Sequence, residues 1–151
     1  MELDLNILRP EERVSLQLRL LYEQAGFRQY HMGHFEEYGL YQENRRFLSS
    51  EQVLTFTDLD GRLLALKPDV TLSIIKNTVD QPGVVEKQYY NENVYRNDPG
   101  THSFKEIMQA GLECIGDLTE CDVAEVVLLA AKSLTRISDN FVLDISHMGL
   151  I

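Results

Sequence analysis

The segment from Phe104 to Ile115 constrains the fold more than any other, because as a β-strand it places every second residue on the same face. The residues on that face are Ile107, Gln109, Gly111, Glu113 and Ile115. Polar Gln109 and Glu113 flank a glycine, so another group can approach the backbone closely between them. At ~3.3 Å per residue they lie roughly 13 Å apart. This spacing suits the two ends of one amino-acid-sized ligand, although a solvent-facing sheet with scattered polar residues has the same pattern.

A second strand is expected just before this one. The segment from Val84 to Val94 reads as a strand, and Tyr95-Arg96-Asn97-Asp98 leads from it into a turn-rich loop. Arg96 lies thirteen residues before Gln109. Two strands joined by a short loop would therefore bring one Arg, one Gln and one Glu to the same space.

Helical and hairpin patterns fill most of the remaining chain. Pro10 with two following glutamates fits the first turn of a helix, and apolar residues then recur at helical spacing up to Gly26. An Asp60-Gly61 turn between two β-prone runs predicts a hairpin. We expect helices at about Pro10–Ala25, Leu72–Val79 and Thr119–Ile137, and strands at Phe27–His31, Val53–Thr57, Arg62–Leu66 and Phe141–Ile145, while Phe35–Arg46 is ambiguous, because its aromatic residues suit one helical face but Gly39 weakens a helix.

The order of these elements predicts an α+β fold in which helices flank an antiparallel or mixed sheet. No internal repeat or low-complexity stretch is present in the sequence. The chain stops six residues after the strand expected at Phe141–Ile145. We therefore expect residues 1–151 to be the N-terminal portion of a larger domain.

Charge and cysteine content argue against several classes of partner. The formal net charge is −10 and Arg45-Arg46 is the only adjacent basic pair, so we expect no nucleic-acid partner. Two cysteines and four histidines without a CxxC motif predict neither a disulfide framework nor a metal site. No secretory signal opens the chain, and no apolar run reaches the ~20 residues that span a bilayer. We expect a cytoplasmic protein with no membrane contact and no cofactor.

Three motifs carry a family resemblance. The first, within Phe56–Thr71, ends in Lys67-Pro68-Asp69-Val70-Thr71; the second is Tyr95-Arg96-Asn97-Asp98; the third is Gln109-Ala110-Gly111-Leu112-Glu113. Together they resemble the histidyl-tRNA synthetase family, in which the first is Arg-Pro-acid-x-Thr and the others begin and end motif 2. The resemblance runs from about Glu11 to the end of the chain. It implies the N-terminal half of a class II aminoacyl-tRNA synthetase-like catalytic domain.

The resemblance also implies a pocket for histidine. Asp69, Thr71 and Gln109 would meet its amino group, Arg96 its carboxylate and Glu113 its imidazole. The chemistry agrees, because an ammonium needs acceptors, a carboxylate suits a guanidinium fork, and an imidazole N–H suits a carboxylate. The alternatives are helix capping for Asp69 and Thr71, an ion pair with Asp98 or Glu106 for Arg96, and a solvated strand position for Glu113.

The loop between the two long strands departs from the synthetase pattern. Residues Asn97–Ser103 include no Lys or Arg to meet ATP phosphates or the tRNA acceptor end. Asp98 stands where the synthetases have a Glu that contacts adenine, and motif 3 and an anticodon-binding domain do not follow in this sequence. The chain therefore resembles more closely the regulatory subunits of ATP phosphoribosyltransferase, which are synthetase paralogues. That resemblance implies a non-catalytic subunit that binds histidine and supports or inhibits its catalytic subunit at the first step of histidine biosynthesis.

Two other functions remain open. A histidyl-tRNA synthetase, or a fragment of one, predicts histidine-dependent pyrophosphate exchange. A structural dimer module would use the helix at Pro10–Ala25 at a twofold interface, as the fold suggests, although Gly33–Glu36 lacks the Pro usual in motif 1. The expected partners are histidine, the catalytic subunit of ATP phosphoribosyltransferase, and a second copy of the chain in a homodimer within a hetero-oligomer.

Overall fold

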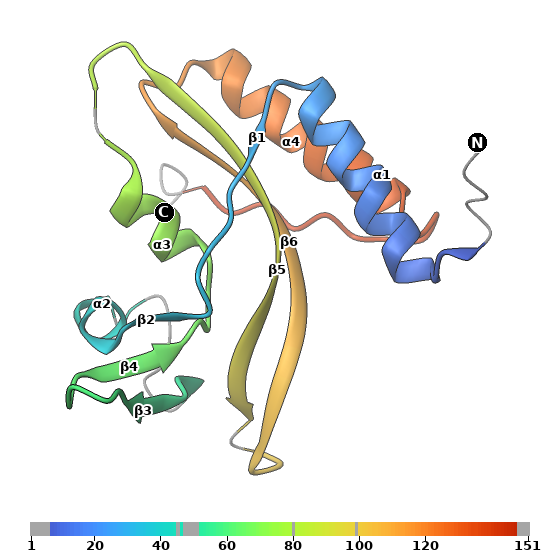
Figure 1. Ribbon diagram of the computed structural model, residues 1–151. Coiled ribbons are helices and arrows are strands. Elements are labelled where there is room, and N and C mark those ends of the chain that lie inside the picture. The colour runs from blue at the N-terminus through green and yellow to red at the C-terminus, as the bar shows by residue number, and fades with distance from the viewer. Residues whose placement is uncertain (1–6, 45, 47–51, 80, 99, 148–151) are drawn as a thin grey trace.

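The computed structural model describes residues 7–44, 46, 52–79, 81–98 and 100–147 (Figure 1). The elements in chain order are α1 Pro10–Gln24, β1 Arg28–Gln29, β2 Phe35–Glu37, α2 Tyr38–Glu43, β3 Thr55–Thr57, β4 Leu63–Leu66, α3 Thr71–Asn77, β5 Val85–Asp98, β6 Ser103–Gly116 and α4 Glu120–Thr135. Helices pack against one mixed and one antiparallel sheet. This arrangement confirms the predicted α+β class.

A long antiparallel hairpin of β5 and β6 forms the centre of the molecule, as the curved pair of strands in Figure 1 shows. Its register runs without interruption from the pair Val85–Gly116 to the pair Asp98–Ser103. The short strand β1 adds to β5 in parallel, which gives the order β1-β5-β6. The two strands expected from the sequence are therefore present, and β5 extends four residues beyond the predicted Val94.

The two faces of this central sheet carry separate hydrophobic cores, because successive residues of β5 point in opposite directions. Tyr89 faces α1 and α4, which lie side by side in Figure 1, whereas Tyr90 faces α3. The first core contains Leu18, Tyr22, Phe27, Tyr89 and Leu129. The second contains Met32, Val70, Ile74, Tyr90 and Val94.

Local sequence signals explain both long helices. In α1, Pro10 occupies the first turn, and Glu12 accepts a hydrogen bond from the backbone N–H of Arg9 at 2.8 Å. In α4, the Thr119 hydroxyl accepts from the Asp122 N–H while the Asp122 carboxylate accepts from the Thr119 N–H. These reciprocal contacts confirm the capping pair predicted at the start of the last helix.

A smaller antiparallel sheet, in the order β2-β4-β3, packs beside the hairpin together with α2. The predicted hairpin is present: Asp58 Oδ1 accepts from the N–H groups of Asp60 and Arg62, and Gly61 has a φ of +82°. The ambiguous segment starting at Phe35 is a three-residue strand followed by a helix, and Arg45 lies outside the described residues.

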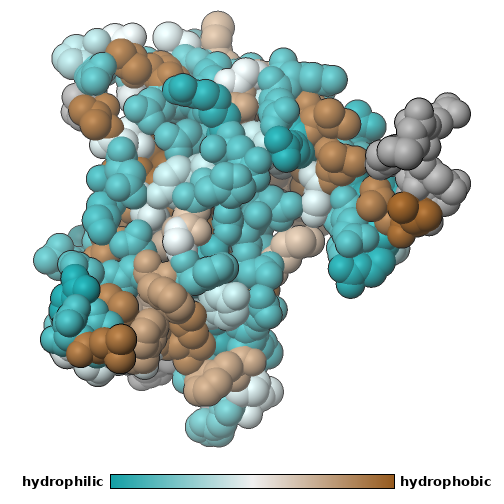
Figure 2. All heavy atoms as spheres, in the orientation of Figure 1, coloured by the Kyte–Doolittle hydropathy of each residue, from teal (hydrophilic) through white to brown (hydrophobic). Residues whose placement is uncertain are grey.

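Apolar side chains gather on the surface of this smaller sheet, in the lower left of Figure 2. The rings of Phe35 and Phe56 meet edge to face with centroids 5.2 Å apart. With Phe104 from the tip of the long hairpin they line an apolar hollow of about 390 Å³. The smaller sheet therefore exposes apolar surface as well as burying it.

The prediction of a strand at Phe141–Ile145 is wrong. In the described part of the chain these residues have no ladder partner and run as irregular backbone after α4. Leu143 instead lies beside α1, β6 and α4. A β-prone run becomes a strand only where a neighbouring strand supplies hydrogen bonds.

None of the described helices has the length and apolar character needed to cross a bilayer.

Candidate functional site

The five residues selected from the sequence lie together on the α3 side of the hairpin. Gln109 and Glu113 share one face of β6, and the register places Arg96 of β5 on the same face. Asp69 and Thr71 reach this face from the start of α3. All five residues are partly exposed.

Thr71 connects α3 to the sheet. Its hydroxyl donates to Glu113 Oε1 at 2.6 Å. Asp69 Oδ1 accepts from the Leu72 N–H at 3.1 Å, so the capping role considered for Asp69 is confirmed, whereas Thr71 bonds to the sheet instead. The alternative of a solvated Glu113 is wrong, because this carboxylate is half-buried and hydrogen-bonded.

Arg96 joins the other end of this group. Its Nε donates to the backbone oxygen of Pro68 at 2.8 Å, and its Nη2 donates to Gln109 Oε1 at 3.3 Å. The described contacts include no ion pair of Arg96 with either carboxylate considered as its alternative partner. Asp98 pairs with Lys105, and Glu106 accepts from Asn93 and Tyr95. The guanidinium is therefore held beside Pro68 and Gln109.

Tyr90 is the residue that the sequence analysis missed. It lies directly opposite Gly111, and a Cβ added to Gly111 would lie 2.4 Å from the Tyr90 hydroxyl oxygen and 2.5 Å from Cζ. The expectation that some group approaches the backbone at Gly111 is thus fulfilled by a side chain of the protein itself. The signal was present in the sequence, since a strand glycine marks a close approach, but the register of the hairpin was needed to identify the neighbour.

The environment of Glu113 raises the pKa of its carboxyl above the ordinary value. Burial raises the pKa of this carboxyl, and the nearby Asp69 charge raises it further, while the hydrogen bond from Thr71 lowers it. A half-buried carboxylate beside a second acid is well suited to accept a hydrogen bond from a cation or from an N–H group.

A buried ion pair borders the site. Lys67 is 1% exposed, and its Nζ contacts Glu92 Oε2 at 2.5 Å. Burial alone would raise the pKa of Glu92, but the contacts with Lys67 and His31 lower it overall. Glu92 is the cross-strand neighbour of Gln109 and shares its face, so this ion pair lies beside the site.

Lys105 is the first Lys or Arg that follows the loop at the tip of the long hairpin, and it lies opposite Arg96. Lys105 pairs with Asp98, which also accepts from the Gly100 N–H at 3.0 Å. The Lys105 bond is the main cause that lowers the pKa of Asp98 to about 2. The charge of Lys105 is therefore already neutralised by a carboxylate, and Pro99 of this loop lies outside the described residues.

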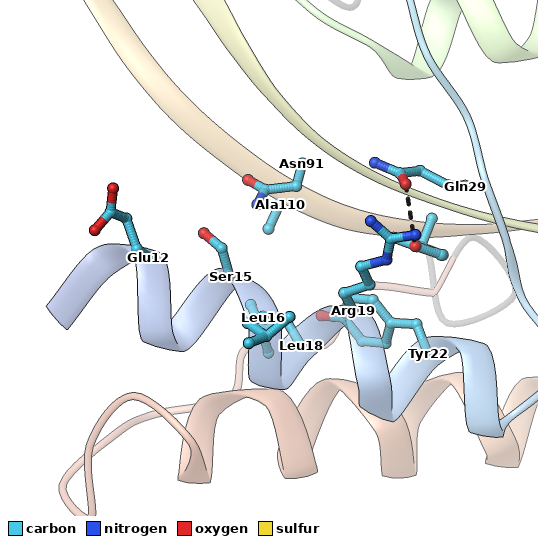
Figure 3. A pocket seen from close by; sticks show the side chains of 10 residues that line it. Glu12, Ser15, Leu16, Leu18, Arg19, Tyr22, Gln29, Asn91 and Ala110 are labelled. Atoms are coloured by element: carbon cyan, nitrogen blue, oxygen red, sulfur yellow. Dashed lines mark hydrogen bonds between the residues drawn. The ribbon is translucent and has the colours of Figure 1, made fainter. Parts of the chain in front are cut away.

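The opposite face of the sheet has a separate hollow of about 340 Å³ between α1 and the strands (Figure 3). Glu12, Ser15 and Arg19 of α1 extend from the helix on the side of the strands, with Arg19 beside Gln29, and Asn91 and Ala110 line the hollow from the sheet. None of the five candidate residues lines it. Within the described ranges, no three His, Cys, Asp or Glu side chains are grouped as a metal site requires.

Comparison with known proteins identifies relatives of two kinds. The sequence profile of the histidyl-tRNA synthetase family matches residues 2–151. A histidine–tRNA ligase of Archaeoglobus fulgidus is 31% identical over 142 residues, which cover 91% of this chain and 35% of that protein. An ATP phosphoribosyltransferase regulatory subunit of Halothermothrix orenii is 34% identical over 106 residues, which cover 67% of this chain and 25% of that protein.

Solved structures share the fold. A protein of Bacillus halodurans described as an ATP phosphoribosyltransferase regulatory subunit/histidyl-tRNA synthetase superposes with a TM-score of 0.65 at 21% identity, over 91% of this chain and 40% of that one. An ATP phosphoribosyl transferase complex of Thermotoga maritima gives 0.61 at 19% identity, over 82% and 41%. The fold is thus class II synthetase-like, and the chain spans about a third of the length of the curated relatives that it matches.

Proposed function

This chain belongs to the histidyl-tRNA synthetase family, and from that premise we propose that it is a regulatory subunit of ATP phosphoribosyltransferase that binds free histidine and catalyses no reaction itself. Histidine bound to this chain would regulate the first step of histidine biosynthesis, through a coupling free energy between its own site and the active site of the partner catalytic subunit. A relative that covers two thirds of this chain carries the name of such a subunit.

The chemistry of the site supports histidine as the ligand. Asp69, Thr71 and Gln109 supply oxygen acceptors for an ammonium group, and Arg96 supplies a guanidinium for a carboxylate. Glu113 supplies the acceptor for an imidazole N–H. Because Thr71 bonds to Glu113 and Arg96 bonds to Gln109, these groups are already positioned before a ligand arrives.

One observation separates this proposal from an enzymatic one: Lys105 at the hairpin tip is paired with Asp98. A bound ATP brings about four negative charges that need cationic side chains or a metal. The loop from Asn97 to Ser103 offers no Lys or Arg, and the nearest basic residue that follows it is engaged. These features support an amino-acid site without a nucleotide site: the loop sequence supplies no Lys or Arg, and in the described residues the Lys that follows it is paired with Asp98.

The second candidate is a histidine–tRNA ligase. It is favoured by the Archaeoglobus relative, whose similarity covers more of this chain than that of the regulatory subunit. The two proposals differ in ligand: a ligase binds ATP and exchanges pyrophosphate in a histidine-dependent way, and a regulatory subunit does neither.

A thermal-shift measurement with the full chain distinguishes them. Histidine at about 100 times its dissociation constant should stabilise the fold by ~2.7 kcal/mol, and ATP should give no shift. Glu113→Gln should weaken histidine binding by about 10- to 100-fold, because the charged acceptor is lost. Glu106→Gln, on the opposite face of β6, is the matched control and should bind normally. Stabilisation by ATP together with pyrophosphate exchange would reject the regulatory function.

We also propose the partners and the extent of the domain. The catalytic subunit of ATP phosphoribosyltransferase should co-purify with the chain, and the chain should form a homodimer within that hetero-oligomer. Residues 1–151 would correspond to the N-terminal portion of a class II synthetase-like catalytic-type domain. A cytoplasmic location stays a prediction.

Co-expression with a catalytic subunit, followed by size-exclusion chromatography and light scattering, tests the assembly. Separate elution of the two proteins would contradict it.

A further inference from the structure

Tyr90 lies between the two ends of the candidate site. We propose that Tyr90 is a positioning residue, whose hydroxyl fixes the amide of Gln109 and thereby the end of the site that meets the ammonium group of the amino-acid ligand. This inference rests on the proposed binding of histidine, because the two ends are defined by that ligand.

The position of the phenol follows from the hairpin register. Tyr90 pairs directly with Gly111, the residue midway between Gln109 and Glu113. The ring crosses the strand at that point, where a Cβ would be only 2.4 Å from its hydroxyl oxygen. Its packing against Val70 and Ile74 leaves the side chain 4% exposed. The ring therefore has no free space to move away, and its hydroxyl stays over the middle of the site.

At one end, Tyr90 fixes the orientation of an amide. Gln109 Nε2 donates to the Tyr90 hydroxyl at 2.9 Å, so the carbonyl oxygen of Gln109 points to Arg96 Nη2 at 3.3 Å. This oxygen has a second lone pair available for an ammonium group. Without the phenol, the amide can rotate and present its NH₂ group to the ligand instead.

The phenol is a neutral group at this position. Burial raises the pKa of Tyr90, so its hydroxyl stays protonated at neutral pH. At the other end of the site, the Thr71 hydroxyl donates to Glu113 Oε1 at 2.6 Å. Tyr90 therefore contributes a neutral hydroxyl at the ammonium end, while Thr71 holds the carboxylate at the imidazole end.

The neighbouring Tyr89 provides a matched control. It is equally buried, at 1% exposure, and its hydroxyl donates to Glu23 at 2.8 Å, but it points to the opposite face toward α1. Tyr89→Phe removes the same phenol hydroxyl from the same strand as Tyr90→Phe, but on the face away from the candidate site.

Calorimetric titration of the full chain with L-histidine tests the proposal. Tyr90→Phe should weaken binding about tenfold, as expected for one lost hydrogen bond that orients charged contacts, while Tyr89→Phe should stay within about twofold of wild type. In a Gln109→Ala background the effect of Tyr90→Phe should shrink to within about twofold, because the amide that the phenol orients is gone. A purely structural role would leave that effect unchanged.

A second measurement uses the wild-type chain and does not depend on how a variant folds. On addition of histidine, the NMR signals of the Tyr90 ring and the Gln109 side-chain amide should shift, and those of the Tyr89 ring should not. Equal histidine affinity of Tyr90→Phe and wild type, or unperturbed Tyr90 signals on saturation, would overturn the inference while leaving the proposed function intact. Absence of histidine binding by wild type would overturn the proposed function and this inference with it.

Discussion

At the scale of single residues, the requirement for glycine at position 111 comes from a neighbouring side chain rather than from the backbone conformation. The φ of Gly111 is not in the left-handed region, so another residue would be tolerated by the backbone. The constraint is the phenol of Tyr90, which occupies the position of the missing side chain. The glycine in the Gln-x-Gly-x-Glu motif is therefore required by packing, and the packing places a hydroxyl in the site.

Gly111→Ala should consequently destabilise the protein by about 1–3 kcal/mol, because a buried ring has to shift to admit the methyl group. Gly39→Ala is the matched control: this exposed glycine lies in α2, a methyl group added there would have no neighbouring atom within 4 Å, and Ala has the higher helix propensity. Urea unfolding monitored by circular dichroism gives both values. A Gly111→Ala protein as stable as wild type would contradict the packing argument.

At the scale of elements, α4 depends on its first turn. The Thr119–Asp122 box satisfies backbone N–H groups that the helix leaves open, and Lys87 of β5 contacts both Asp122 at 3.3 Å and Glu125 at 2.5 Å. The Tyr22 and Ser133 hydroxyls, 2.8 Å apart, then join α1 to α4 in the core. The helix is thus held at its start by polar contacts and along its length by the core.

Thr119→Ala should lower the free energy of unfolding by about 1 kcal/mol, the usual value of an N-cap. Thr135→Ala, at the other end of α4, serves as the control, because its hydroxyl bonds to the nearby Lys132 carbonyl within the helix and should contribute little. Chemical denaturation of both variants tests this. Equal destabilisation by the two substitutions would indicate that the box is not the source of the effect.

At the scale of the whole molecule, the net charge of −10 makes stability sensitive to pH. Hydrogen bonds within the Thr119 box are the main cause that lowers the pKa of Asp122 from 3.8 to about 2, and the Lys105 bond has the same effect on Asp98. Glu113 behaves in the opposite way, because burial raises its pKa. The folded protein is therefore favoured when Asp98 and Asp122 are ionised.

Stability should therefore fall as the pH is lowered from about 4 to about 2. A carboxyl with a lowered pKa in the fold stabilises it above its ordinary pKa of 3.8, and this contribution disappears as the pH passes through about 2. Protonation of Glu113 favours the fold and opposes part of this loss. Urea unfolding at a series of pH values measures the slope, and Asp98→Asn with Asp122→Asn should flatten it. An unchanged slope in the double variant would reject this assignment.

The sequence by itself determined the elements whose signals are local. Capping residues located α1 and α4, and the Asp-Gly turn located the β3–β4 hairpin, because each depends on hydrogen bonds between residues close in the chain. Period-two spacing also put Gln109 and Glu113 on one face correctly. The motif resemblance identified the family for the same reason, since motifs are runs of neighbouring residues.

Only the tertiary structure decided what those residues touch. The expected strand at Phe141–Ile145 has no partner in the described part of the chain, and no local pattern reveals whether a partner exists. Likewise, Arg96 bonds to Pro68 and Gln109 instead of the acids near it in sequence. Tyr90 became part of the site only through a cross-strand register. Contacts of this kind depend on how distant segments meet, which the free energy of the whole fold sets and the spacing along one segment does not.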